Sequence, residues 1–170
     1  TIQLANLALL AELTTIDTVG DFRGRDIAAG GQGAPLVPAF HDVVFRDAHA
    51  PRVIVNIGGI ANLTFLGPNH DRVLGFDVGP GNILLDGWCQ RHTAKPYDAE
   101  GQWAATGQCC QPLLQALLSD AYFSQSPPKS TGRDYFNLNW LDAHLINYPK
   151  FAPYDVQATL VDLTAQSIAC

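Results

Sequence analysis

The stretch from Val53 to Asn82 constrains the fold more than any other part of this 170-residue chain. It holds three apolar runs that are rich in Val, Ile, Leu and Phe, as strands are: Arg52–Ile57, Ala61–Leu66 and Arg72–Asp77. Each run has the length of a strand, and only a few residues separate one from the next. The spacing therefore predicts three consecutive strands that pair as antiparallel hairpins.

Turn-forming residues join these runs. Gly58-Gly59 joins the first two, and glycine has no Cβ to obstruct a tight turn. Gly67–His70 has a typical loop composition and joins the second run to the third. The third run leads through Gly79–Asn82 into an apolar-periodic segment, Ile83–Trp88. The sequence therefore predicts a β-β-β-α unit.

Polar residues and glycines in this unit lie where they could bind a ligand or take part in a reaction. The glycines of Asn56–Gly59 lie at a hairpin tip, where backbone N–H groups can approach an anion closely. Asp77 ends a strand next to glycines at a helix start, and a carboxylate there can act as a general base or help to hold a metal. Such short glycine motifs are weakly specific. The alternative is that Asp77 caps a turn and the glycines only make bends.

The rest of the chain is predicted to be mainly helical, with no further strand after Arg91. Thr15–Val19 is a candidate for a short strand before the main unit. Arg46–Pro51 is a polar connector and a candidate domain boundary. Apolar residues at helical spacing predict helices at Leu4–Leu13, Leu36–Phe45, Ala99–Thr106, Pro112–Leu118, Leu138–Ile146 and Val156–Ala169.

A group of charged residues in Asp21–Asp26 precedes the glycine-rich segment Ile27–Pro35. Arg23 or Arg25 can hold a carboxylate or a phosphate through the planar guanidinium fork. Asp21 and Asp26 accompany them, so the group suits a polar ligand. The alternative is a surface ion-pair cluster beside a loop, since exposed pairs are common and weak.

The segment Ser126–Asn137 contains Lys-Ser-Thr-Gly-Arg, which is similar to a phosphate-binding sequence. It lacks the GxxxxGK[ST] spacing of a P-loop. We therefore favour a loop that ties helices together, with Arg133 holding backbone carbonyls.

Composition excludes several classes of protein. The formal net charge of −6 argues against nonspecific nucleic-acid binding. No apolar run is long enough to cross a bilayer, and the first residues do not resemble a signal peptide. The four cysteines, which show neither CxxC nor zinc-finger spacing, indicate reduced thiols in a cytoplasmic protein: Cys89, Cys109, Cys110 and Cys170. The chain lacks Met and begins and ends within helical patterns, so we expect an internal piece of a longer protein.

Six segments together resemble one family, in register over nearly the whole chain. They are DFRGRDIAAGGQGAPLVPAFH (Asp21–His41), NIGGIANLTFL (Asn56–Leu66), GFDVGPGNILLDGW (Gly75–Trp88), KPYD (Lys95–Asp98), PKSTGRDYFN (Pro128–Asn137) and DVQATLVDLTAQSI (Asp155–Ile168). The chain resembles the anhydro-N-acetylmuramic acid kinase family of the actin/hexokinase/Hsp70 ATPase superfamily.

The resemblance implies an α/β fold: a ribonuclease-H-like β-β-β-α core of the actin-like ATPase fold, followed by a helical segment, as a fragment of a two-domain kinase. Residues 1–46 would end the first actin-like domain, and residues 47–170 would form part of the second. The family uses ATP, Mg²⁺ and water to open the 1,6-anhydro bridge of 1,6-anhydro-N-acetylmuramic acid and to phosphorylate O6. The product is N-acetylmuramic acid 6-phosphate, in peptidoglycan recycling and amino sugar catabolism. Family members are often homodimers.

The resemblance also implies roles for individual residues. Asp77 matches the catalytic aspartate, a general base that deprotonates the attacking water. Sugar binding would fall to Arg25, Asp26, Gly33 and Asn82. The phosphates of ATP would be bound by Asn56, Gly58, Gly59, Asn62, Gly79 and Gly81. No residue is assigned as a metal ligand.

The chain departs from the family at several points. The usual QIGNP appears as Gln3–Leu7, which alters a turn on the sugar side. The N-terminal phosphate-binding hairpin and the C-terminal adenosine segment are absent, so ATP would be held from one side only. We therefore expect no turnover by these 170 residues alone. Alternatives to an active kinase are a noncatalytic sugar- or nucleotide-binding member, a structural domain, and a kinase for another sugar.

Overall fold

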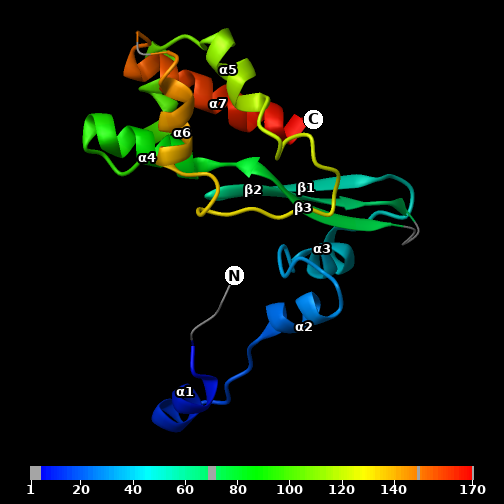
Figure 1. Ribbon diagram of the computed structural model, residues 1–170. Helices are drawn as coiled ribbons and strands as arrows, with labels where there is room; N and C mark the ends of the chain where they lie inside the picture. The colour runs from blue at the N-terminus through cyan, green and yellow to red at the C-terminus, as the bar shows by residue number, and fades with distance from the viewer. Residues whose placement is uncertain (1–4, 69–71, 149, 170) are drawn as a thin grey trace.

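A three-stranded antiparallel sheet lies between a helical layer and an N-terminal arm (Figure 1). The computed structural model describes residues 5–68, 72–148 and 150–169. The strands β1 (Arg52–Ile57), β2 (Ile60–Leu66) and β3 (Val73–Pro80) lie in the order β1-β2-β3. Helix α4 follows β3 directly, so the predicted β-β-β-α order is confirmed.

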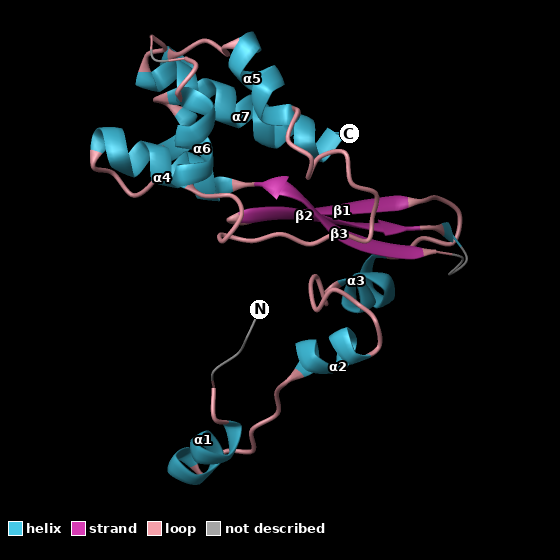
Figure 2. Ribbon diagram, in the orientation of Figure 1, coloured by secondary structure: helices cyan, strands magenta, loops and turns pink. Residues whose placement is uncertain are grey.

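The helices fall into two groups (Figure 2). One group, α4 to α7, forms the helical layer at one end of the sheet. In the other group α3 packs against β2 and β3, while α1 and α2 extend away as the arm. Their bounds are α1 Leu7–Thr14, α2 Phe22–Ala28, α3 Pro38–Phe45, α4 Asn82–Thr93, α5 Gln111–Leu118, α6 Leu138–Leu145 and α7 Pro153–Ala169.

The third strand is longer than predicted. It continues past Asp77 to Pro80 because Ile60 pairs with Pro80 at the start of β2. Asn62 pairs with Asp77 and Ala61 pairs with Gly79, which leaves Val78 as the extra residue of a β-bulge. The second turn closes with a hydrogen bond of 2.8 Å from the Gly67 N–H to the Arg72 carbonyl. The predicted turn residues Asn69 and His70 lie outside the described residues.

The main core lies within the helical layer. Its nine buried members come from α4, α5, α6 and α7: Leu84, Trp88, Leu113, Leu114, Leu117, Leu141, Val156, Leu160 and Leu163. Each such burial stabilises the fold by about 1.5–3 kcal/mol relative to exposure. The Trp88 Nε1–H also donates to the Pro153 carbonyl at 2.8 Å, which joins the start of α7 to α4.

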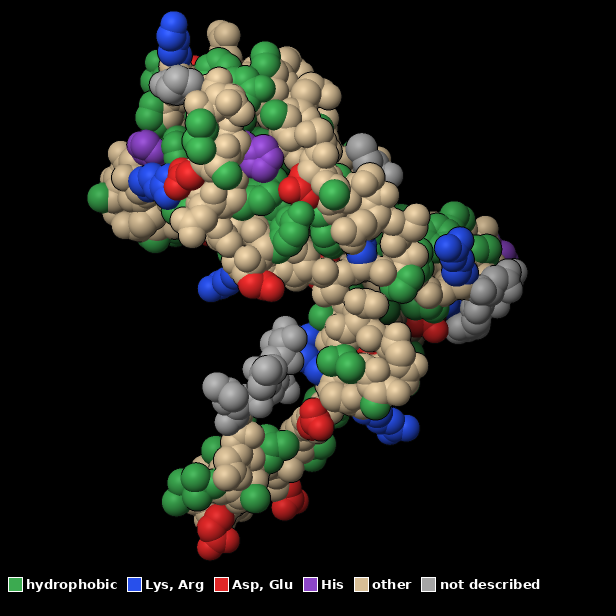
Figure 3. Space-filling model, in the orientation of Figure 1, with side chains coloured by type: hydrophobic (Ala, Val, Ile, Leu, Met, Phe, Trp, Pro, Cys, Tyr) green, Lys and Arg blue, Asp and Glu red, His purple; other side chains and the backbone are tan. Residues whose placement is uncertain are grey.

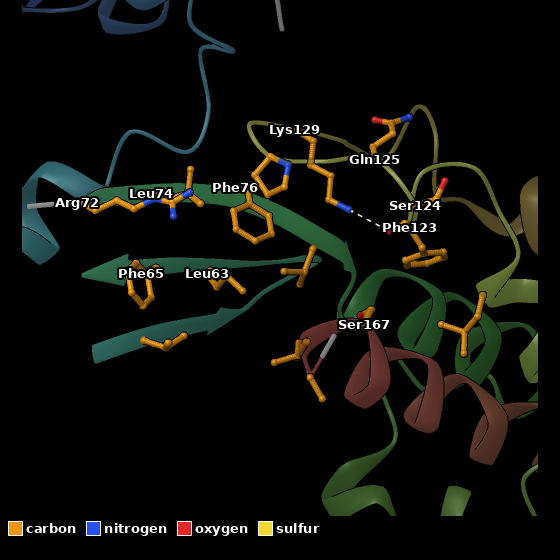
Figure 4. Close-up of a pocket in the computed structure, with 16 residues that line it drawn as sticks. Leu63, Phe65, Arg72, Leu74, Phe76, Phe123, Ser124, Gln125, Lys129 and Ser167 are labelled. Atoms are coloured by element: carbon orange, nitrogen blue, oxygen red, sulfur yellow. Dashed lines mark hydrogen bonds between the residues drawn. The ribbon is translucent and has the colours of Figure 1, made fainter. Parts of the chain in front are cut away.

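The two faces of the sheet differ. On one face, Leu63 and Phe65 of β2 and Leu74 and Phe76 of β3 line an apolar groove of about 730 Å³ (Figure 4). Side chains alternate along a strand, so the neighbouring residues face the other way, towards α3.

Helix α3 covers that second face of the sheet. The Nδ1 atom of His41 lies 2.9 Å from the Thr64 hydroxyl, and Pro38 packs against Gly75. His41 is therefore a buried packing residue. Helix α3 begins at Pro38 rather than Leu36, because this proline occupies the first turn.

The arm exposes many apolar side chains (Figure 3). The predicted strand Thr15–Val19 is wrong. Thr15 ends α1 in a left-handed conformation (φ 55°), and no strand pairs with the segment among the described residues. Ile16 and Val19 are 67% and 77% exposed. Branched residues favour a strand only where a neighbouring strand supplies hydrogen bonds, and none lies here.

The predicted helix Ala99–Thr106 is also wrong. It consists of two 3₁₀ turns, η2 (Ala99–Gly101) and η3 (Ala104–Thr106). Glu100 has a positive φ of 57°, which breaks a helix. The Asp98 carboxylate accepts the N–H groups of Trp103 and Ala104 at 2.9 and 2.8 Å, so a side chain replaces helical hydrogen bonds.

The remaining predicted helices are confirmed within a few residues of their bounds. Over the described ranges, we find no helix that has both the length and the apolar character needed to span a bilayer. Cys89, Cys109 and Cys110 are free thiols, as predicted, while Cys170 lies outside the described residues. Burial raises the pKa of the Cys109 thiol to about 12.

Candidate active site around Asp77

Asp77 lies on the face of β3 that also carries Gly75, and it is only 6% exposed. Its Oδ2 atom accepts two hydrogen bonds of 2.9 Å, from the Ser130 hydroxyl and from the Thr131 backbone N–H. Within the described part of the chain, no donor bonds its Oδ1 atom. A loop 53 residues further along the chain therefore fixes one carboxylate oxygen and leaves the other available.

The backbone of Asp77 is held as well. Its N–H donates to the Lys129 carbonyl at 3.1 Å, and its carbonyl accepts the Tyr122 hydroxyl at 2.8 Å. The Lys129 Nζ in turn donates to the Tyr122 carbonyl at 3.1 Å and lies 4.7 Å from the centre of the Tyr122 ring. Burial lowers the pKa of Lys129; burial, and then the nearby Asp77 carboxylate, raise the pKa of Tyr122. Asp77 thus sits in a closed ring of hydrogen bonds.

Two residues that contact or pair with Asp77 each carry a buried side-chain oxygen without a hydrogen-bond partner in the described part of the chain. Asn62 Oδ1 and Thr131 Oγ1 are both buried without a hydrogen bond. Asn62 is the direct cross-strand partner of Asp77, and the backbone of Thr131 bonds the Asp77 carboxylate. An unpaired buried polar atom costs about 1–3 kcal/mol. Buried polar atoms are normally hydrogen-bonded, so each of these two oxygens is expected to bind a water or a ligand hydroxyl.

A polar cavity of about 390 Å³ lies beside the loop that holds Asp77. Arg23 and Gly33 of the arm line one side, and Ser130, Thr131 and Gly132 line the other. Asp77 is not among its lining residues, but both residues that bind the carboxylate are. The volume and the polar lining suit a small ligand rich in hydroxyl groups.

Of the four predicted sugar-binding residues, Gly33 lines this cavity, and Asp26, which does not line it, bonds Gly33. The Asp26 carboxylate accepts the Gly33 N–H at 2.7 Å, and Gly33 is buried with a positive φ of 72°. Arg23 donates to the Gly33 carbonyl at 2.5 Å, so this arginine faces the cavity. Arg25 is exposed and does not line the cavity. Its role stays a prediction.

The predicted sugar-binding residue Asn82 lies elsewhere. It begins α4, is exposed, and lines a separate cavity of about 270 Å³ with Asp86 and Gln157. Its role also stays a prediction.

The glycine hairpin contacts the start of α4. The Gly58 carbonyl accepts the Asn82 N–H at 2.7 Å, and the Gly59 carbonyl accepts the N–H groups of Gly81 and Ile83 at 3.0 and 3.1 Å. The first N–H groups of a helix need such partners. The hairpin therefore caps α4.

The predicted phosphate-binding glycines differ in the space around them. A Cβ at Gly81 would lie 2.2 Å from the Gly58 carbonyl oxygen, and one at Gly79 would lie 2.8 Å from the Phe123 ring. The lack of space for a side chain thus explains why residues 79 and 81 are glycine. A Cβ at Gly58 or Gly59 would meet only atoms 3.7 and 3.9 Å away. Packing therefore does not explain why residues 58 and 59 at the hairpin tip are glycine. Close approach of a ligand to the backbone would explain it. The two predicted asparagines pair across strands: Asn56 is exposed on β1, and Asn62 on β2 lies opposite both Asn56 and Asp77. Their role in phosphate binding stays a prediction.

This contrast predicts different effects of two alanine substitutions. Gly81→Ala should destabilise the protein by about 1–3 kcal/mol, because the new methyl group collides with backbone. Gly59→Ala should change stability by about 0.5 kcal/mol or less. Chemical denaturation of a full-length polypeptide that contains this sequence measures both. Equal destabilisation by the two substitutions would contradict the close contact of Gly81 with the Gly58 carbonyl. If phosphates approach the tip, Gly59→Ala should still weaken ATP binding.

The described residues do not build a metal site of their own. They contain no group of three or more His, Cys, Asp or Glu side chains that could hold a metal ion.

The sequence pointed to the polar loop but not to its role. Arg133 is exposed, and within the described part of the chain its guanidinium makes no hydrogen bond. Asn137 ties the loop instead, since its amide donates to the carbonyls of Arg133 and Asp134 at 3.2 Å. Ser130 and Thr131 were missed as partners of Asp77. The only signal was their polarity.

Comparison with known proteins agrees with these observations. The model of the family described as anhydro-N-acetylmuramic acid kinase matches residues 1–170, the whole chain. This chain belongs to the anhydro-N-acetylmuramic acid kinase family. The family expected from the six sequence segments is thereby confirmed.

Curated relatives carry the name anhydro-N-acetylmuramic acid kinase. One from Coxiella burnetii is 56% identical over 170 residues, which cover 99% of this chain and 45% of the relative. One from Pseudomonas putida is 56% identical over 168 residues, covering 99% and 46%. One from Nitrosospira multiformis is 58% identical over 169 residues, covering 99% and 45%. The chain thus spans a little under half the length of these relatives.

Proposed function

We propose that this chain forms part of an ATP-dependent kinase that opens the 1,6-anhydro bridge of 1,6-anhydro-N-acetylmuramic acid and phosphorylates O6. The observation that carries the proposal is the Asp77 carboxylate, with Oδ2 fixed by Ser130 and Thr131 and Oδ1 available. The adjoining polar cavity and the family membership support it. The product would be N-acetylmuramic acid 6-phosphate. The expected cytoplasmic location and homodimer remain part of this proposal.

The proposal includes the architecture of the whole enzyme. The unit from β1 to α4 would be the ribonuclease-H-like core of one actin-like domain. The arm and α3, in residues 1–46, would end the other domain. The irregular connector at residues 46–51 and the β1-β2-β3 order support this division.

In the proposed reaction Asp77 acts as the general base. Its Oδ1 takes a proton from a water, whose oxygen forms a bond to the anomeric carbon. The bond between that carbon and the bridge oxygen breaks, and the bridge oxygen keeps the electron pair. This oxygen, O6 of the sugar, then bonds to the γ-phosphorus of ATP, and ADP leaves. A positioned base contributes about 10²–10⁴-fold in such reactions. Phosphoryl transfer depends mainly on positioning and on electrostatics.

Nucleotide binding is assigned to the hairpin tip. The open space at Gly58 and Gly59 supports close approach by phosphate groups. Mg²⁺ typically binds through substrate phosphates, waters and one or two carboxylates. We propose that it enters with ATP and neutralises charge on the phosphates.

The direct test is ADP release by a full-length polypeptide that contains this sequence. We expect turnover with 1,6-anhydro-N-acetylmuramic acid, and a product heavier than the substrate by one water and one phosphoryl group. N-acetylmuramic acid, which lacks the bridge, is the matched comparison and should be a poor substrate. Folded protein that binds the anhydro sugar without releasing ADP would indicate a noncatalytic member. ADP release with another sugar only would indicate a different kinase.

A further inference from the structure

The loop residue that contacts the Asp77 carboxylate through its side chain is Ser130. A carboxylate on a single side chain can rotate, and its two oxygens are then equivalent. Here the Ser130 hydroxyl and the Thr131 N–H converge on the same oxygen, Oδ2, at 2.9 Å each. Two donors on one oxygen remove this equivalence and leave Oδ1 as the oxygen without a donor among the described residues.

The position of the Ser130 hydroxyl is itself fixed. The preceding residue, Lys129, accepts the Asp77 N–H through its carbonyl, and its side chain is tied to the Tyr122 carbonyl. The Tyr122 hydroxyl returns to the Asp77 carbonyl. The chain before Ser130 is thus anchored to the same strand residue that Ser130 contacts. Such support keeps a reacting group within a narrow range of positions.

We propose that Ser130 is a positioning residue for the reaction: it holds Asp77 Oδ2 so that Oδ1 faces the attacking water. This inference rests on the proposed role of Asp77 as the base. Ser130 does not exchange a proton with the substrate and acts only through the carboxylate. Asn62, the cross-strand partner of Asp77, and Thr131, whose backbone N–H bonds Oδ2, each carry a buried side-chain oxygen without a partner among the described residues. A bound water would satisfy such atoms.

The test compares Ser130→Ala with Ser130→Thr in a full-length polypeptide that contains this sequence. Removing a hydrogen bond to a charged group should lower kcat by about 10- to 100-fold, with KM for the sugar and for ATP unchanged within about twofold. Ser130→Thr keeps the hydroxyl and should restore most of kcat. Ser124→Ala is the matched control, because the Ser124 hydroxyl is exposed and bonds only the nearby Ala121 carbonyl in the described chain. It should behave like the unaltered protein.

A double-mutant cycle separates positioning from a structural role. If Ser130 acts through Asp77, adding Ser130→Ala to Asp77→Asn should lower kcat by less than about twofold further. An equal loss in both backgrounds, or a wild-type kcat in Ser130→Ala, would overturn the inference. If Asp77→Asn alone keeps full turnover, then the proposed base has failed, which is a separate result. Thermal melting checks that each variant is folded.

Discussion

Asp77→Asn is expected to lower kcat for the anhydro sugar by about 10²–10⁴-fold, the usual contribution of a general base. Asparagine has nearly the size of aspartate, and its amide oxygen can take the place of Oδ2. It would then still accept both hydrogen bonds from Ser130 and Thr131. The amide nitrogen would take the place of Oδ1, and it cannot accept a proton. The variant therefore removes the chemistry while it keeps the loop contacts.

The measurement is coupled ADP release by a full-length polypeptide that contains this sequence. Asp17→Asn makes the same chemical change at an exposed position of the arm and should leave kcat unaltered. A melting temperature close to that of the unaltered protein would show that the loop contacts survive in Asp77→Asn. If kcat in Asp77→Asn stays within about threefold of the unaltered protein, then another group acts as the base.

Phe136→Ala is expected to destabilise the protein by about 3–5 kcal/mol. Phe136 has no exposed surface and closes the loop that holds Asp77. Its ring centre lies 5.4 Å from that of Tyr122 and 5.1 Å from that of Trp140, both in edge-to-face arrangements. Alanine would remove these aromatic contacts and leave a cavity between the loop and the helical layer.

Urea denaturation of the same full-length polypeptide measures this loss. Phe136→Leu retains most of the apolar volume and should cost less than half as much as Phe136→Ala. If the two variants are equally destabilised, aromatic geometry rather than volume holds the loop. A loss below about 1 kcal/mol in Phe136→Ala would show that the site can collapse around the void.

Local sequence patterns were enough to predict the sheet. Strand-forming runs separated by short glycine-containing turns specify hairpins, and β1 has the bounds predicted for it. Two elements were wrongly predicted, and in both the sequence pattern does not show which groups the backbone will hydrogen-bond. Thr15–Val19 has the composition of a strand but no neighbour to pair with. Ala99–Thr106 has helical spacing, yet the Asp98 side chain takes over the backbone N–H groups that a helix would use.

The candidate site was only partly predictable. Asp77 lies in a short strand-to-helix motif with Gly79 and Gly81, and the hairpin glycines form a Gly58-Gly59 pair, so both could be found from local motifs. The contact of Asp77 with Ser130 joins residues 53 positions apart, in a loop without periodicity. Neither spacing nor composition encodes such a contact, because it depends on how α5 and α6 pack. The sharing of Gly33 by Arg23 and Asp26 likewise appears only once the arm is folded.

The β-bulge at Val78 affects how accurately β3 pairs with β2. Phe76 and Val78 face the apolar groove, as does Gly79 through Phe123 and Ser167, while Asp77 faces the other way. A slip of β3 by one residue along β2 would turn Asp77 into the groove, where an unpaired charge is costly. The extra residue allows Asp77 and Gly79 to face opposite sides of the sheet. The Asp77 charge makes the shifted pairing less stable than the native pairing. The residue proposed for chemistry thus also guards against misfolding.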